Sequence, residues 1–186
     1  MDDLPQPRPE LRTALERVLT ADVESFRDGV AQLGTEYGFD TDRLATTPDA
    51  FEPNGDIGGV SARDRRPVWR AWTLEAAPIG VVLTGPAYQD NPLIYANRAT
   101  RRLTGYTLAE LQGENLRLLQ GPRTGRDAVE ALREAIRGWS SVTVEVCNHR
   151  ADGTPFVNRV SIVPVPDVNG TVQHWFGLQA AVPDAR

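Results

Sequence analysis

Three carboxamide side chains stand among apolar residues in the C-terminal part of the chain, in segments with the alternation of β-strands. Asn148 shares its face with Val144 and Val146, and Asn158 and Gln179 lie in the next two such segments. Successive side chains of a strand point to opposite faces, so each carboxamide points the same way as its apolar neighbours. A buried amide needs partners for both its donor and its acceptor. The three amides therefore bond to one another, to backbone or to water, or they bind a ligand that has alternating donors and acceptors.

A second group of polar residues lies in residues 115–122, which read NLRLLQGP, and in the helix predicted after them. Arg117 belongs to this segment, and Arg133 lies at the edge of the apolar stripe of the helix. A guanidinium in such a place can bind a phosphate through two parallel hydrogen bonds. The alternative is an exposed arginine paired with Glu130 or Glu134, which is usual on a helix surface. Arg117 and Arg133 are thus candidate phosphate contacts.

The elements that position these residues follow from hydrophobic periodicity and from turn residues. Gly105 and Gly113 divide residues 98–120 into short helices, and residues 124–139 predict a longer one. Asp152-Gly153 and Asn169-Gly170 are hairpin turns, because both dipeptides tolerate positive φ. Strands are predicted at residues 79–84, 91–97, 141–150, 154–165 and 171–182. The order is two strands, several helices and a three-stranded meander.

The first 66 residues differ from the rest in composition. Residues 1–66 carry 8 arginines and 14 acidic residues, whereas residues 67–186 carry 12 and 11. Helical spacing of apolar residues predicts two amphipathic helices, at residues 11–19 and 23–33, and residues 34–66 have the composition of a loop or linker. We therefore expect a helical extension and linker at residues 1–66 and a second domain at residues 67–186.

Residues 115–120 resemble the flavin-binding motif of the LOV (light-oxygen-voltage) family of the PAS superfamily, which usually reads NCRFLQ. Several separated matches in one order are more specific than one short motif. Further landmarks of the family occur in order as NPLIYAN at 91–97, LTGY at 103–106, DGTPF at 152–156 and GLQ at 177–179. The resemblance covers roughly residues 79–182. It implies an α+β PAS/LOV fold, with a five-stranded antiparallel sheet and helices on one face, here preceded by the N-terminal helical extension.

The resemblance also implies a flavin, whose carbonyls and ring nitrogens would satisfy the three carboxamides. FMN is favoured over FAD, because the connection after Gln120 has no insertion that would accommodate an adenine. Arginines that match Arg117 and Arg133 contact the flavin phosphate in the family. The residues expected to bind the cofactor are Asn115, Leu116, Arg117, Gln120, Arg133, Asn148, Asn158, Gln179, Val82, Thr84, Leu119 and Ile162. A degenerate PAS module without a cofactor is disfavoured, because it would leave these polar groups without partners.

Leu116 departs from the family pattern, in which this position holds the cysteine that attacks the flavin in blue light. Leucine has no nucleophile, so that adduct cannot form here. The single cysteine, Cys147, neighbours Asn148 in a strand and faces the other way. We therefore expect photoreduction of FMN to the neutral semiquinone, with Gln179 rotating its amide when the flavin is protonated at N5. Trp175 is either a nearby electron donor or a core aromatic.

These residues predict a blue-light-sensing flavoprotein whose output passes through the N-terminal extension, a homodimer or a separate signalling partner. A light-independent flavin redox sensor is the alternative. The protein is not expected to be an enzyme, because His149 and His174 are isolated and the chain has no catalytic triad, phosphate loop or metal cluster. Since the sequence ends at Arg186, shortly after the last predicted strand, no C-terminal effector domain is expected.

Composition sets further limits. With one cysteine and 20 basic residues that are all arginine, the chain forms no internal disulfide, Cys-rich zinc site or lysine Schiff base. A formal net charge of −5 argues against general nucleic-acid binding. No apolar run has the length of a signal peptide or membrane helix, so a cytoplasmic protein without membrane association is expected.

Overall fold

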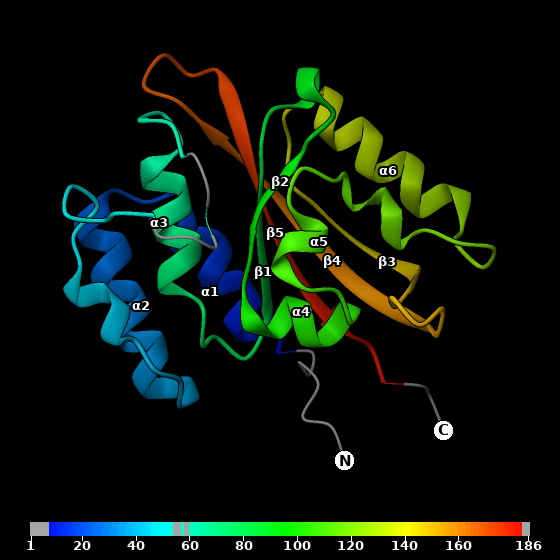
Figure 1. The fold of residues 1–186 in the computed structure, drawn as a ribbon, viewed down its shortest axis with the longest axis horizontal. Coiled ribbons are helices and arrows are strands. Elements are labelled where there is room, and N and C mark those ends of the chain that lie inside the picture. Colours follow the sequence, from blue (N-terminus) through cyan, green and yellow to red (C-terminus); the bar gives the residue numbers. More distant parts are fainter. Residues whose placement is uncertain (1–7, 54–56, 58–59, 184–186) are drawn as a thin grey trace.

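A five-stranded antiparallel sheet forms the centre of the computed structural model, which describes residues 8–53, 57 and 60–183 (Figure 1). The strand order is β2-β1-β5-β4-β3, so the first and last strands pair in the middle of the sheet. The strands are β1 (Gly80–Thr84), β2 (Leu93–Ala96), β3 (Val142–His149), β4 (Pro155–Pro166) and β5 (Val172–Ala181). Both predicted hairpin turns have glycine at positive φ, with 84° at Gly153 and 81° at Gly170. The predicted five-stranded antiparallel sheet is confirmed.

Short helices and one longer helix cover the face of the sheet that we call the inner face (Figure 1). Asn97 caps the first of them by accepting the Thr100 N–H, and Gly105 ends it at φ 78°. These elements are the 3-10 turn η2 (Ala87–Gln89), α4 (Arg98–Thr104), α5 (Leu108–Leu111), the 3-10 turn η3 (Leu116–Leu119) and α6 (Arg126–Arg137). Glycines therefore separate the short helices where the sequence predicts, and α6 corresponds to the predicted helix at residues 124–139.

The opposite, outer face of the sheet is covered by the N-terminal helices (Figure 1). These are α1 (Pro9–Leu19), α2 (Val23–Tyr37), the 3-10 turn η1 (Asp42–Ala45) and α3 (Arg65–Thr73). Asp22 starts α2 by accepting the Ser25 N–H at 2.9 Å. The apolar stripes of α1 and α2 are buried and form one cluster with outward side chains of β1 and β5, such as Leu83 and Phe176. Helices thus cover both faces of the sheet, because the apolar stripes find their partners within the chain.

Residues 34–66, predicted as loop or linker, contain more ordered structure than their composition indicates. Helix α2 continues to Tyr37, η1 lies within the segment, and α3 begins at Arg65, so the predicted boundary near Pro67 falls inside a helix. Phe39, Phe51 and Ile57 belong to the buried cluster. These apolar residues are isolated from one another along the sequence and show no helical or strand period, so hydrophobic periodicity does not predict their burial. Residues 1–7, 54–56 and 58–59 of the predicted extension lie outside the described residues.

Buried polar groups connect the extension to the sheet and its helices. Glu75, just after α3, pairs with Arg101 of α4 at 2.6 Å and accepts the Tyr95 hydroxyl of β2 at 2.5 Å. Burial opposes ionisation of Glu75, but the bonds from Arg101 and Tyr95 outweigh it, so the pKa of Glu75 is lowered. Arg43 of η1 donates to the Trp72 carbonyl at 2.9 Å. The carboxylate of Glu75 is therefore held between the end of α3, α4 and β2.

A second polar contact joins β5 to the start of α3. His174 is 3% exposed on the outer face, and its Nε2 lies 2.7 Å from Oδ1 of Asp64. Ser61 donates to the other carboxylate oxygen of Asp64, also at 2.7 Å. His174, which the sequence shows only as an isolated histidine, is thus part of the attachment between the sheet and the N-terminal helices.

Candidate functional site

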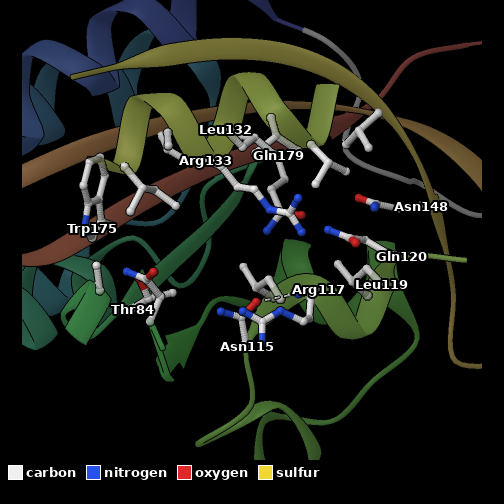
Figure 2. Close-up of a pocket in the computed structure, with 18 of the residues that line it drawn as sticks. Thr84, Asn115, Arg117, Leu119, Gln120, Leu132, Arg133, Asn148, Trp175 and Gln179 are labelled. Carbon is white, nitrogen blue, oxygen red and sulfur yellow. Dashed lines mark hydrogen bonds between the residues drawn. The ribbon is translucent and has the colours of Figure 1, made fainter. Parts of the chain in front are cut away.

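A cavity of about 310 Å³ lies between the inner face of the sheet, η3 and α6 (Figure 2). Ten of the twelve residues predicted to bind a cofactor line it: Thr84, Asn115, Leu116, Arg117, Leu119, Gln120, Arg133, Asn148, Ile162 and Gln179. They come from the first strand, the 115–120 segment, the long helix and the three-stranded meander. The fold therefore brings together residues that are up to 95 positions apart, from Thr84 to Gln179.

The two remaining predicted residues, Asn158 and Val82, do not line the cavity. Asn158 is fully buried, and its Nδ2 donates to Oδ1 of Asn148 and to Oε1 of Gln179, both at 2.9 Å. Val82 is 1% exposed in a small cluster against which Leu116 packs. Asn158 therefore holds two carboxamides that reach the cavity, and Val82 lies beneath a side chain of its wall.

Among the three carboxamide side chains, one buried donor atom and one buried acceptor atom are unpaired. Within the part of the chain that the structure describes, Oδ1 of Asn158 and Nε2 of Gln179 have no hydrogen-bond partner, although both atoms are buried. Mutual bonding, one of the sequence-based interpretations, therefore satisfies the three side chains only in part. A buried amide atom without a partner is costly, about 1–3 kcal/mol. The arrangement thus favours a ligand that both donates and accepts.

Arg117 is held beside the cavity by Asp90. Its two terminal nitrogens lie 2.7 and 2.5 Å from the two carboxylate oxygens of Asp90. Asn115 accepts the Arg117 N–H at 2.9 Å and donates to the Asp90 carbonyl at 2.5 Å. The start of η3 is thereby fixed, with Arg117 beside Asn115 at the cavity (Figure 2) and 59% of the Arg117 side chain exposed.

Arg133 both lines the cavity and pairs with a carboxylate on its own helix. Its Nη1 lies 3.5 Å from Oε2 of Glu130, the partner that the alternative interpretation names. Figure 2 shows its side chain extending from α6 toward the space near Gln120 and Gln179. Arg133 is 60% exposed and Glu130 48% exposed, so the ion pair is weak. The pairing is therefore compatible with a role in ligand binding.

Apolar side chains form the walls. Val129, Leu132 and Ile136 contribute one wall from α6, and Val146 and Val160 contribute another from the sheet. The α6 residues are those of the apolar stripe that the sequence shows. A planar apolar group between helix and sheet would contact both walls.

Leu116 and Trp175 also face the cavity, whereas Cys147 does not. Leu116 is the first residue of η3, and Trp175, 4% exposed, lies on the inner face of β5. Cys147 follows Val146 and precedes Asn148, both of which line the cavity, so strand alternation places it on the outer face. It pairs there in register with Val157 of β4.

Arg137 is the charged lining residue that the sequence-based list omits. It lies one helical turn after Arg133, and its Nη1 is 3.2 Å from Oε1 of Glu130. The spacing i, i+4 on one helix face is the signal by which it could have been found. Ala87 and Asn91, from the segment between β1 and β2, were missed as well.

Two other kinds of feature, a metal site and a membrane-spanning helix, are absent from the described residues. No group of three or more His, Cys, Asp or Glu side chains is placed to hold a metal ion. No helix in the described ranges has both the length and the apolar content needed to cross a bilayer.

Residues 78–179 match the family model described as PAS domain. The chain is 36% identical over 126 residues to a blue-light-activated histidine kinase of Brucella anthropi, a match that covers 68% of this chain and 25% of that protein. A protein of the same name from Rhizobium johnstonii is 35% identical over 145 residues, 75% of this chain and 42% of the relative. Phototropin-2 of rice is 39% identical over 109 residues, 59% of this chain and 12% of the relative. The chain thus spans less than half the length of these three relatives.

Solved structures give the same result. The light-state LOV structure of the photoreceptor aureochrome 1 superposes with a TM-score of 0.55 at 37% identity, covering 56% of this chain and 82% of the other. The LOV domain of a blue-light-activated histidine kinase from Erythrobacter litoralis gives a TM-score of 0.54 at 36% identity, covering 56% and 95%. The resemblance of the sequence to LOV domains is confirmed.

The prediction that the protein is not an enzyme is contradicted by these relatives. Two of those described are named histidine kinases, which are enzymes, and the chain matches 25% and 42% of their lengths. A sensor segment and a catalytic segment can lie in different parts of one protein. The lack of a catalytic motif in the residues compared is therefore no argument against an enzyme.

Proposed function

This chain belongs to the PAS domain family, in its LOV branch, and from this premise we propose that it binds FMN in the cavity and senses blue light. The observation that carries the proposal is the pair of unpartnered buried atoms, Nε2 of Gln179 and Oδ1 of Asn158. A flavin ring presents carbonyl acceptors and an N–H donor along one edge, which matches this need. The bound flavin would supply blue-light absorption and one-electron chemistry.

The other lining residues fit the remaining parts of FMN. The apolar walls from α6 and the sheet suit the two faces of a planar ring. Arg117 and Arg133 stand at the exposed side, where a phosphate can keep partial contact with water. Asn148 and Gln179 are fixed by Asn158, so their orientation is set before a ligand arrives. The predicted site residues therefore remain our proposal for the flavin contacts. Asn158 would contribute its unpartnered Oδ1 as well as holding the other two amides, and Val82 would support the wall from beneath.

Leu116 determines the chemistry that we propose. It places an apolar side chain in the cavity wall, and the single thiol lies on the other face of the sheet, so no cysteinyl adduct is available. We propose photoreduction to the neutral semiquinone instead. Trp175 is the proposed electron donor, an external reductant restores it, and water at the exposed side of the cavity would supply the proton. Gln179, with an amide that both donates and accepts, would rotate to follow the change of protonation at the flavin.

The N-terminal helices are the proposed route of output. β5 carries Trp175 and Gln179 on its inner face and His174 on its outer face, where His174 contacts Asp64. A change at the cavity side of β5 is thereby one residue away from an attachment of the extension. We propose an N-terminal extension at residues 1–66 and a flavin domain at residues 67–186, with α3 spanning the boundary between them. The proposed partner is a second copy of the chain or a separate protein, and the proposed location is the cytoplasm.

Absorbance spectroscopy before and after blue light tests the proposal, with Leu116→Cys as the matched variant. We expect a flavin spectrum, a neutral-radical spectrum after anaerobic illumination with a mild reductant, and no adduct band. Leu116→Cys should gain the adduct band, and Trp175→Phe should slow photoreduction. A colourless protein that cannot be reconstituted with FMN contradicts flavin binding, and a persistent oxidised spectrum contradicts the photochemistry. Reduction in the dark at cytosolic potential would favour the alternative, a light-independent redox sensor.

A further inference from the structure

Three arginines border the cavity, and only two carboxylates pair with them. Arg117 forms an ion pair with Asp90, whereas Arg133 and Arg137 both pair with Glu130. Each takes a different oxygen of that carboxylate, Oε2 for Arg133 at 3.5 Å and Oε1 for Arg137 at 3.2 Å. Among the described residues that form these pairs, the mouth of the cavity therefore carries one positive charge in excess.

The ion pairs of α6 are weak enough to exchange. Arg133, Arg137 and Glu130 are 60%, 70% and 48% exposed. Exposed pairs of this kind contribute about 0–1 kcal/mol, because water screens them and two long side chains lose freedom. A phosphate offers three acceptor oxygens and a charge of about −1.5 to −2 at neutral pH. A phosphate at the cavity mouth is therefore a stronger partner for both guanidiniums than one shared carboxylate.

We propose that Arg137 is a third contact to the phosphate of the bound flavin and that Glu130 is the counterion displaced when that phosphate binds. The proposal rests on the proposed function, since it assumes a flavin in the cavity. Helix geometry supports it, because positions 133 and 137 lie on the same face of α6, and both side chains line the cavity. Arg137 thereby makes the site selective for a phosphorylated flavin over riboflavin, which has no phosphate. Glu130 acts against binding by competing for the same two guanidiniums.

Equilibrium titration of the flavin-free protein with FMN and, separately, with riboflavin tests this assignment by fluorescence quenching. Arg137→Ala should weaken FMN binding about tenfold and leave riboflavin binding unchanged, because one charge-assisted contact is lost. Glu130→Gln should tighten FMN binding by about two- to fivefold, since it removes the competitor, again without effect on riboflavin. Arg102→Ala is the control, because Arg102 is exposed on α4 and lines neither the cavity nor the pocket beside it.

The outcomes separate this inference from the proposed function. Equal weakening of FMN and riboflavin by Arg137→Ala, or an effect no larger than that of Arg102→Ala, overturns the role of Arg137 while flavin binding stands. Weaker FMN binding by Glu130→Gln overturns the role of Glu130 as competitor. Failure of the unchanged protein to bind either flavin contradicts the proposed function itself. Arg137→Lys, which keeps the charge without the planar fork, should lie between the unchanged protein and Arg137→Ala.

Discussion

Replacement of Asn158 by leucine would remove the side chain that joins the two carboxamides of the cavity. Asn158 is fully buried, and leucine has the same branching of heavy atoms, so the change keeps the approximate shape of the side chain and deletes its polar groups. Oδ1 of Asn148 and Oε1 of Gln179 would each lose a donor at 2.9 Å. Both side chains are at most 4% exposed, so water has little access to the position of the lost donor.

The size of the effect follows from counting unpartnered atoms in each state. Without flavin, the variant creates two unpaired acceptors but removes the unpaired Oδ1 of Asn158, so the net loss is about one penalty of 1–3 kcal/mol. With flavin, that Oδ1 has a partner in our proposal, so the offset disappears and the loss rises to about 2–6 kcal/mol. The difference, about 1–3 kcal/mol, corresponds to a flavin affinity lower by about 5- to 150-fold.

Urea unfolding of the flavin-free and the FMN-loaded protein, together with FMN titration, measures both quantities. Gln179→Leu and the double variant complete a cycle, and we expect the two changes to be non-additive by about 0.5–3 kcal/mol because the side chains are in contact. Unchanged unfolding free energy in the flavin-free Asn158→Leu protein would refute the hydrogen-bond reasoning. Lower stability with unchanged FMN affinity would refute the role of the amides in the site.

Three further changes test other parts of the structure. Gly121→Ala should destabilise the protein by about 1–3 kcal/mol, because the new Cβ would overlap the ring of His149, as circular dichroism melting can measure. Burial raises the pKa of Asp64, but its hydrogen bonds with Ser61 and His174 outweigh burial and lower the pKa overall. The ionised carboxylate therefore contributes to stability above a pH of about 4, and this contribution is lost as pH falls through the lowered pKa. Asp64→Asn should therefore flatten the acid limb of unfolding free energy against pH. Trp69→Ala should cost about 3–5 kcal/mol in urea unfolding, because the indole is fully buried and its Nε1 donates to a backbone carbonyl at 2.8 Å.

Matched controls exist in the chain for each of these changes. Gly125→Ala should have little effect, because nothing lies within 4 Å of a Cβ built there, and equal losses at 121 and 125 would contradict the steric argument. Trp139→Ala should stay within about 0.5 kcal/mol, because Trp139 is 61% exposed. Asp167→Asn, on the exposed β4–β5 turn, is the control for Asp64, and the same change of the acid limb in both variants would argue against the contact with His174.

The sheet and its polar face were predictable because their signals are local and periodic. Alternation in residues 154–165 corresponds to β4 at Pro155–Pro166, and it puts Asn158 on the inner face as expected. The meeting of Asn148, Asn158 and Gln179 follows once the three strands are paired in order. Register is set by period-two patterns and by tight turns, both of which the sequence displays.

The parts that escaped prediction depend on contacts between distant residues. Phe51 is buried against Trp72, with ring centroids 5.0 Å apart, in a segment that reads as loop. Arg133 was expected either to pair with Glu130 or to reach the site, and it does pair while lining the cavity. An arginine in a surface ion pair and an arginine that contacts a ligand look the same in a helical sequence. Only the three-dimensional structure shows that Arg133 can do both.

The position of Cys147 allows a spectroscopic probe to be attached at a single site. It is half-buried on the edge strand β3, on the outer face of the sheet, and it is the one thiol in the sequence. With no lysine present, a maleimide spin label or dye has one intended side-chain target. Such a probe would lie on the same outer face of the sheet as His174, without entering the cavity. Distance or mobility changes on illumination could therefore be followed without first engineering an attachment residue.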